Sequence, residues 1–322
     1  MGFSQPQQLG GTGISVAPLM LGLEALAGYD WGDLDPKQVE DATRYAFDLG
    51  FTFCDVADCY GLGLAEERLG AIMTGRRQEI VVGTKFGVRV EGGKTRYDNS
   101  PTYMRTAIEA SLKRLGTDYI DLYQLHWPDN QTPFDDVIAQ FQRFFEEGKV
   151  RAYGLSNRTF SAEELSNLPA EFVSHSLEYS LANRSNETQI ASVEENSDLS
   201  FLSWGTLGQG VLSGKYSAQS KFSANDRRSK GHWLNFQDAQ LARNMQIVEV
   251  MKSVFEELDE ADIPLTAIAI RWNMERFKRA IPIVGFKSRK QVEGNAKALT
   301  IQLSDAALAK LDAVSSGSMQ RD

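Results

Sequence analysis

Four residues with acidic, basic or hydrogen-bonding side chains lie at or just beyond the ends of predicted strands. Asp55, Lys85 and His126 end three short, mostly apolar runs, and Tyr60 follows Asp55 in a glycine-rich loop. Taken singly, they are more simply strand caps, solvated charges, a structural histidine and a loop aromatic. Together they have the composition of a proton-transfer site, in which a tyrosine donates a proton to an oxygen atom.

Lys85 is the residue expected to activate that tyrosine. An ammonium and a phenolate attract each other by about 4 kcal/mol at about 4 Å and a dielectric constant of about 20. This attraction would lower the pKa of the Tyr60 phenol by at most roughly three units. Asp55 would keep Lys85 charged and offset part of the effect. His126 could donate a hydrogen bond to the substrate or to the phenol.

These residues need a scaffold that brings distant strand ends together. Strand-like and helix-like segments alternate almost throughout the chain, which indicates parallel strands with right-handed crossovers. The expected strands are residues 16–21, 51–55, 80–85, 119–126, 150–156, 172–178, 199–204 and 280–284. The expected helices are residues 36–49, 65–73, 101–115, 133–147, 161–168, 187–196, 239–260, 265–277 and 289–298.

Eight such units predict an α/β fold of the (β/α)8 TIM-barrel type, formed as a single domain over residues 1–322. Residues 9–16 are expected to form an N-terminal β-hairpin that plugs the bottom of the barrel. Active sites of such barrels lie at the C-terminal ends of the strands, where the four residues would meet. Residues 217–238 are the least regular segment, and they predict either a mobile loop over the site or a long excursion.

Composition excludes several classes of partner. The formal net charge of −9 argues against nucleic acid or an anionic membrane as the main partner. Two cysteines, Cys54 and Cys59, with three scattered histidines do not form a zinc motif, so no metal is expected. Cys54 is expected in the core. No signal peptide or membrane-spanning run is visible, and we expect a cytoplasmic protein whose oligomeric state the sequence does not reveal.

Motifs along nearly the whole chain resemble those of the aldo-keto reductase family. Single motifs would be weak, but their number, order and spacing are specific. They are LGGTGISV (9–16), DVADCYGLG (55–63) with Glu66, Glu67, Leu69 and Gly70, TKFG (84–87), SLKRLGTDYIDLYQLH (111–126), GKVRAYGLSN (148–157), Glu178-Tyr179 with Asn183-Arg184, GVLSGK (210–215) and IPIVG (281–285).

The resemblance implies that hydride passes from NADPH to an aldehyde or ketone. Tyr60 would then be the general acid, Lys85 and Asp55 would tune it, and His126 would orient the carbonyl. Two alternatives stay open at this point. One is a non-catalytic, NADP-binding regulatory subunit with the same barrel. The other is a barrel isomerase or hydrolase that uses Glu or metal chemistry.

The resemblance also implies a binding site for NADP(H). Ser156 and Asn157 would hold the nicotinamide carboxamide, and Trp204 would stack under the ring where the family usually has tyrosine. Ser176 replaces the usual glutamine, so its contact would need a bridging water. The full set of expected cofactor-binding residues is Gly22, Leu23, Asp55, Ser156, Asn157, Ser176, Trp204, Gly205, Leu207, Gln209, Gly210, Lys215, Gly285, Phe286, Lys287, Arg289, Gln291 and Asn295.

Charged residues near the expected cofactor bear on the choice of NADP and on the choice of substrate. Ser288 could cap the last helix, whose N-terminus favours an anion, and Lys287 and Arg289 would suit the 2′-phosphate of NADP. Glu24 stands where many family members have an aromatic residue, and it could either change substrate choice or face solvent.

Substrate contacts are expected from Trp31, Tyr60, His126 and Trp127, with the segment around Trp233 on the outer wall.

Overall fold

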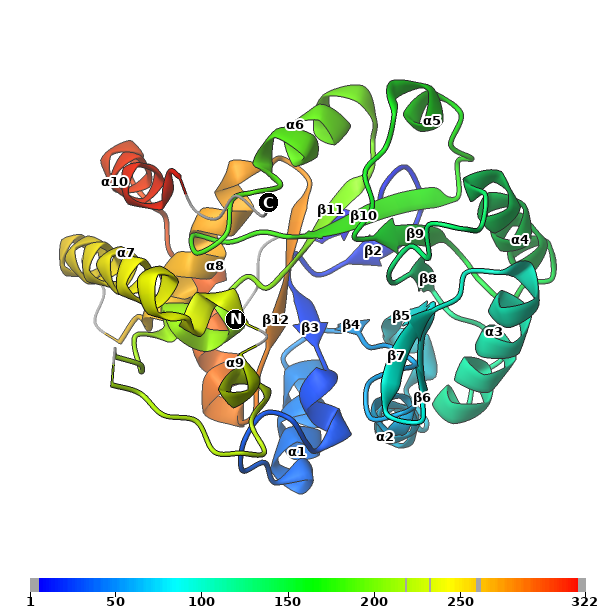
Figure 1. Ribbon diagram of the computed structural model, residues 1–322, viewed down its shortest axis with the longest axis horizontal. Helices are drawn as coiled ribbons and strands as arrows, with labels where there is room; N and C mark the ends of the chain where they lie inside the picture. The colour runs from blue at the N-terminus through cyan, green and yellow to red at the C-terminus, as the bar shows by residue number, and fades with distance from the viewer. Residues whose placement is uncertain (1–5, 218, 232, 259–261, 318–322) are drawn as a thin grey trace.

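The computed structural model describes residues 6–217, 219–231, 233–258 and 262–317. Within these ranges, eight parallel strands close a barrel, as the sequence predicted (Figure 1). In order around the barrel they are β3 (Met20–Gly22), β4 (Phe53–Asp55), β5 (Val81–Phe86), β8 (Leu122–Leu125), β9 (Tyr153–Ser156), β10 (Phe172–Glu178), β11 (Ser200–Trp204) and β12 (Ala280–Gly285). The first predicted strand was misplaced, because Val16 belongs to the N-terminal hairpin and β3 extends to Gly22.

Helices surround the barrel and start at recognisable caps. Asp35 accepts a hydrogen bond from the Lys37 amide at the start of α1, and Ser100 accepts one from the Tyr103 amide at the start of α3. The helices are α1 (Pro36–Asp48), α2 (Leu64–Met73), α3 (Pro101–Leu115), α4 (Phe134–Glu146), α5 (Ala162–Ser166), α6 (Glu187–Asn196), α7 (Asp238–Glu257), α8 (Leu265–Arg276), α9 (Arg289–Ala296) and α10 (Asp305–Ser315). The sequence prediction missed α10. The predicted end of α7 at Glu260 lies outside the described residues.

A small hairpin closes the N-terminal end of the barrel, as expected. Its strands are β1 (Gln7–Gln8) and β2 (Ser15–Val16). Between and beside them, Leu9, Ile14 and Val16 are buried against the apolar side chains inside the barrel. The Gly10 amide donates a hydrogen bond to Ser200 Oγ at 2.9 Å, which fixes the hairpin to β11.

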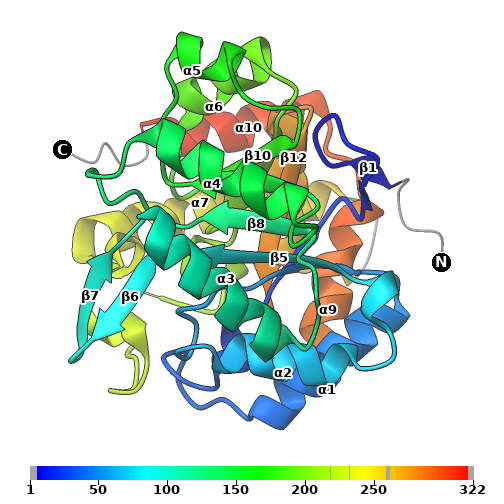
Figure 2. The same ribbon diagram turned by 90° about the vertical axis from the view of Figure 1, so that its right-hand side faces the viewer.

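A second hairpin, which the sequence prediction missed, extends from the opposite end. It consists of β6 (Val88–Glu91) and β7 (Lys94–Tyr97), joined by Gly92 and Gly93 with φ angles of 57° and 76°. Two consecutive glycines with positive φ suit a tight two-residue turn. In Figure 2, β5 and β8 run across the view, with β1 on one side and the β6–β7 hairpin on the other.

Alternation along the strands explains why polar residues collect at one end of the barrel. Phe53 and Leu122 point into the barrel and belong to its apolar inner cluster. Side chains two positions apart point to the same side of a strand. Asp55 therefore also points inward, one layer nearer the C-terminal end. The barrel interior thus changes from apolar at the hairpin end to charged at the other.

The described helices include none with the length and apolar character that crossing a membrane requires.

Candidate active site

Asp55 and Lys85 form a buried ion pair at the C-terminal ends of neighbouring strands. Lys85 Nζ lies 2.5 Å from Asp55 Oδ1, and the two side chains are only 4% and 6% exposed, respectively. Lys85 also donates a hydrogen bond to the Val56 carbonyl at 3.2 Å. Because β4 and β5 are adjacent and pair Asp55 with Gly83, the lysine two residues further along reaches the carboxylate directly.

Tyr60 and His126 complete a cluster around this pair. Lys85 Nζ lies 5.3 Å from the centroid of the Tyr60 ring. The Tyr60 and His126 rings meet edge to face, with centroids 5.9 Å apart and an interplanar angle of 83°. The structure therefore brings together the four residues that the sequence singled out, although they come from two strands, the residue directly after a third strand and a loop.

Burial sets the protonation states in this cluster. It raises the pKa of the Tyr60 phenol well above its usual value, and the negative charges of Asp55 and Glu24 act in the same direction. We expected Lys85 to lower this pKa, but the net shift is in the opposite direction, because burial and the negative charges of Asp55 and Glu24 dominate. Burial, followed by the charge of Lys85, holds the pKa of His126 well below its usual value. A protonated phenol therefore faces a neutral imidazole.

Asn157 connects the histidine to the expected nicotinamide end of the site. Its Nδ2 donates to the His126 carbonyl and to Ser156 Oγ, both at 3.0 Å, and its Oδ1 accepts from Trp204 Nε1 at 3.0 Å. The Asn157 backbone has a φ of 59°, a left-handed conformation that asparagine tolerates better than most residues. Ser156, Asn157 and Trp204 thus lie side by side, as the sequence predicted.

Ser176 uses its hydroxyl within the barrel. Its Oγ donates to the Leu202 carbonyl on the adjacent strand at 2.7 Å, and the residue is buried. This hydrogen bond occupies the hydroxyl proton, which leaves only the oxygen lone pairs for any other partner. The contact between Ser176 and a carboxamide stays a prediction.

The N-terminus of α9 carries the expected phosphate-binding groups, but both cations have protein partners. Ser288 caps α9 by accepting from the Gln291 amide. Lys287 Nζ donates to the Trp31 carbonyl at 2.6 Å, and Arg289 contacts both Asp41 oxygens at 2.7 and 2.5 Å. Burial, followed by the charge of Arg228, lowers the pKa of Lys287. A bound phosphate would have to compete with Asp41 for Arg289.

The remaining predicted cofactor residues lie in the loops around the barrel mouth. A side chain at Gly22 would come within 3.2 Å of the Gly285 amide, so glycine keeps β3 and β12 closely packed there. Gly205 and Gly210 have φ angles of 68° and 97°. Leu23, Phe286 and Asn295 are buried, Leu207 and Gln209 are partly buried, Lys215 is exposed, and Gln291 Oε1 accepts from the Lys287 amide.

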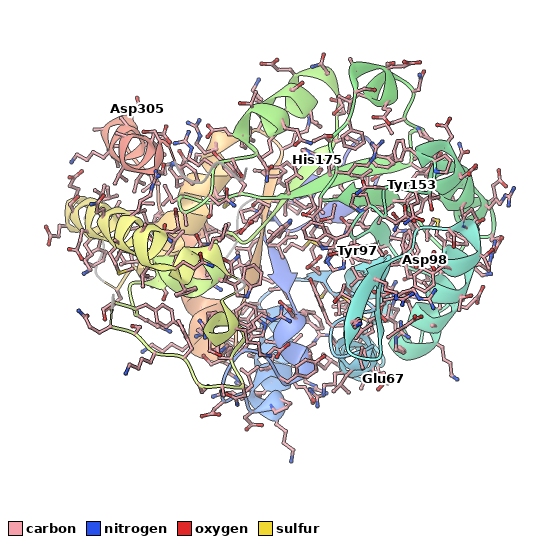
Figure 3. The ribbon with its side chains drawn as sticks, viewed as in Figure 1. Glu67, Tyr97, Asp98, Tyr153, His175 and Asp305 are labelled. Atoms are coloured by element: carbon pink, nitrogen blue, oxygen red, sulfur yellow. The ribbon has the colours of Figure 1, made fainter. Side chains whose placement is uncertain are left out.

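Aromatic side chains line one side of the mouth. The Trp127 ring lies 6.4 Å from the Trp204 ring and 6.3 Å from the ring of Tyr97, measured between centroids. Figure 3 labels Tyr97 at the end of β7. Sequence reasoning did not find Tyr97, although Gly92-Gly93 between two β-prone runs is a recognisable hairpin signal. Trp127 therefore has neighbours on both sides.

Trp31 lies in a different, charged part of the rim. Its ring is near Arg227, Arg228 and Lys287, with the charged groups 5.7, 5.6 and 6.0 Å from the centroid. The sequence did not indicate Arg227, which contacts Glu24 at 2.5 Å and Asp30 at 3.1 Å.

These contacts join η4 (Arg227–Lys230) to the loop that follows β3, and η5 (Leu234–Phe236) follows further along the irregular segment, of which residues 218 and 232 lie outside the described residues. Trp233 precedes η5 and is partly buried.

Two observations bear on other chemistries. Across the described ranges, no group of three or more His, Cys, Asp or Glu side chains is arranged to hold a metal ion. Cys54 is fully buried in the core between barrel and helices, as expected.

Comparisons with known proteins agree with the fold and identify the family. Residues 18–316 match the model of the Aldo/keto reductase family. The chain is 30% identical over 302 residues to aldo-keto reductase yakc [NADP(+)] of Schizosaccharomyces pombe, covering 90% of this chain and 85% of that protein. It superposes on the glycerol dehydrogenase AKR11B4 of Gluconobacter oxydans with a TM-score of 0.84 and 27% identity, covering 96% and 94% of the two chains. The holo form of aldo-keto reductase AKR11C1 of Bacillus halodurans gives a TM-score of 0.76 at 27% identity, with 96% of each chain covered.

Proposed function

Because this chain belongs to the aldo/keto reductase family, whose members reduce carbonyl groups with a nicotinamide cofactor, we propose that it reduces an aldehyde or ketone with NADPH and that Tyr60 donates the proton. The observation that carries the proposal is the cluster of Tyr60, His126 and the buried Asp55–Lys85 pair. The described barrel would act as one catalytic domain. A cytoplasmic location stays a prediction from the sequence.

The rim of the barrel fits a dinucleotide cofactor. The Trp204 indole is only partly buried and could stack on a flat ring, while Asn157 fixes its edge. Gly22 and Gly285 place no side chains of their own at the ends of β3 and β12, and Lys287 and Arg289 flank the N-terminus of α9. When bound, the nicotinamide supplies hydride to the carbonyl carbon.

Tyr60 would protonate the oxygen that becomes an alkoxide. Its phenol is protonated at neutral pH because burial raises its pKa. Loss of the proton leaves a phenolate, which would be stabilised by the Lys85 ammonium, whose Nζ lies 5.3 Å from the ring centroid. Asp55 holds Lys85 beside the ring through their 2.5 Å contact. Stabilisation that appears only as the phenolate forms lowers the energy of the transition state for proton transfer and leaves the energy of the resting enzyme unchanged.

His126 would orient the carbonyl as a neutral hydrogen-bond donor. Its pKa is held well below the usual value, so it does not compete with Tyr60 as an acid at neutral pH. Trp127 and Tyr97 would form the apolar wall that excludes water from the reacting carbonyl. Trp31 and Glu24 would lie toward the charged side of the mouth, where they would favour substrates with polar substituents.

A preference for NADPH over NADH is the finer part of the proposal. Lys287 and Arg289 support it because both are cationic and close to a helix N-terminus. The yeast relative whose name includes NADP(+) supports the same preference.

The experiment is oxidation of NADPH by the purified protein with a panel of aldehydes, ketones and sugars, repeated with NADH. The glycerol dehydrogenase among the structural neighbours makes glycerol with NADP+ a useful substrate for the reverse direction. We expect turnover with at least one carbonyl and faster turnover with NADPH. Cofactor binding without turnover on the whole panel would instead favour a regulatory subunit. Failure to bind either cofactor would contradict the reductase assignment.

A further inference from the structure

Cys59 contacts the catalytic histidine from the residue directly before Tyr60. Its Sγ lies 3.7 Å from His126 Nδ1, within the range of a hydrogen bond that involves sulfur. The adjacent Tyr60 ring meets the same imidazole edge to face. Two consecutive residues of one loop therefore contact one ring, and the mechanism above uses only one of them.

The protonation states make the thiol the donor in this contact. Burial raises the pKa of Cys59, so the sulfur carries its proton at neutral pH. The low pKa of His126 leaves the imidazole neutral, with one nitrogen protonated and the other free to accept. A thiol sulfur is a weak acceptor and an imidazole lone pair is a good one. The favourable arrangement is therefore S–H donating to Nδ1.

The backbone of His126 is fixed independently of the thiol. The His126 amide donates to the Phe86 carbonyl at 2.9 Å, and its carbonyl accepts from Asn157 Nδ2 at 3.0 Å. With both main-chain groups bound, the tautomer and orientation of the imidazole are set by what its nitrogens contact.

We propose that Cys59 is a positioning residue. Its thiol donates a hydrogen bond to Nδ1, takes no part in the proton transfer, and holds His126 in the tautomer with hydrogen on Nε2. That hydrogen is then available to the substrate oxygen on the side of the ring away from Cys59. The catalytic consequence rests on the proposed carbonyl reduction, whereas the tautomer is a property of the protein without ligand.

The first test is the tautomer itself. Nitrogen chemical shifts of the full chain, labelled with ¹⁵N-histidine, distinguish a protonated from an unprotonated imidazole nitrogen. The chain has three histidines, and His126→Gln assigns the signal of interest. We expect Nε2–H alone in the native protein and in Cys59→Ser, which keeps a donor, and a mixture in Cys59→Ala. Nδ1–H in the native protein, or an unchanged signal in Cys59→Ala, overturns the proposal.

The second test separates positioning from a merely structural role. Losing one hydrogen bond to the histidine should lower kcat in Cys59→Ala by about two- to tenfold, with KM for NADPH unchanged, and Cys59→Ser should recover most of the loss. Cys54→Ala is the matched control, because Cys54 is equally a free cysteine on this segment but is buried in the outer core. An equal loss of kcat in the control, or no rescue by serine, contradicts the proposal. If the native protein reduces no carbonyl, the proposed function fails while the tautomer result still decides this inference.

Discussion

The two ends of the barrel interior differ in chemical character, because one is lined by apolar side chains and the other by charged ones. At the N-terminal end, Leu9, Ile14 and Val16 of the hairpin are buried against apolar side chains. At the C-terminal end, Asp55 and Lys85 are almost as inaccessible but carry opposite charges 2.5 Å apart. The same eight strands support both layers, because successive inward positions along each strand belong to different layers.

The difference shows where this fold gains stability and where it gives some up. Burial of apolar groups stabilises the closed end by roughly 25 cal/mol for each Å² removed from water. A buried ion pair loses its hydration, and the attraction between its members often only balances that cost. The charged end therefore adds little to folding stability, and its proposed catalytic role accounts for it better. Substitutions at the two ends should separate these contributions.

The largest combined effect on stability and activity is expected for Lys85→Met, which leaves the Asp55 carboxylate buried without its partner. Breaking a buried pair on one side costs about 3–5 kcal/mol of unfolding free energy, and kcat should fall by about 10²-fold or more. Urea unfolding and steady-state kinetics measure both. The double variant Asp55→Asn/Lys85→Met should recover stability but not activity. Recovery of activity would show that the charged layer is not catalytic.

At the opposite end, Leu9→Ala should destabilise the protein and leave the chemistry intact. Removing a fully buried leucine side chain leaves a cavity and costs about 2–5 kcal/mol. Gly11→Ala is the control in the same turn, because nothing lies within 4 Å of the added methyl. Measured well below the melting temperature, kcat/KM should match the native value in both. A loss of kcat in Leu9→Ala would break the division between the two ends.

Asp58 extends the comparison to a second carboxyl group, which lies on the loop that follows β4 and whose pKa shift is opposed by Arg114 rather than by a lysine. Burial and the nearby Glu66 raise its pKa from 3.8 to about 8. Between these values the folded protein keeps a proton that the unfolded chain has lost, so stability falls as pH rises through this window. We expect the free energy of unfolding to drop by more than about 1 kcal/mol from pH 5 to pH 8. Asp58→Asn should reduce this dependence, and an identical slope would argue against the raised pKa.

The smallest effect concerns cofactor choice at the outer rim. Arg289→Ala should raise KM for NADPH by about tenfold, since a charged hydrogen bond to phosphate is worth about 1.5 kcal/mol or more, and leave KM for NADH unchanged. Asp41→Asn is the matched variant, because it frees Arg289 from its present partner. That variant should keep or improve the use of NADPH. Equal changes with both cofactors would place the 2′-phosphate elsewhere.

The sequence predicted the barrel, the hairpin plug and the clustering of Asp55, Tyr60, Lys85 and His126 because all three depend on local patterns. Short, mostly apolar runs predict buried strands, and an Asp or Lys that ends such a run is expected at the C-terminal rim of the barrel. The β6–β7 hairpin was missed although its Gly92-Gly93 turn is readable. Its contact from Tyr97 to Trp127 depends on how that excursion folds back, which no local pattern specifies.

Two other features depend on the assembled structure. Arg227 and Glu24 are 203 positions apart in the sequence, and their ion pair requires the loop after β3 to meet the irregular segment after β11. The direction of the Tyr60 pKa shift depends on burial and on the net charge around the phenol. Counting the attraction of Lys85 with only a partial offset from Asp55 gave the wrong sign, because the loss of water and the charge of Glu24 cannot be weighed without coordinates.

Tyr60→Phe tests the central claim, that the charged end of the barrel exists to deliver a proton from this phenol. The substitution removes one oxygen from a ring that otherwise keeps its contact with His126. We predict a fall in kcat of about 10²- to 10⁴-fold, with NADPH affinity, measured by fluorescence titration, and unfolding free energy close to native values. Turnover at the native rate in this variant would contradict the account.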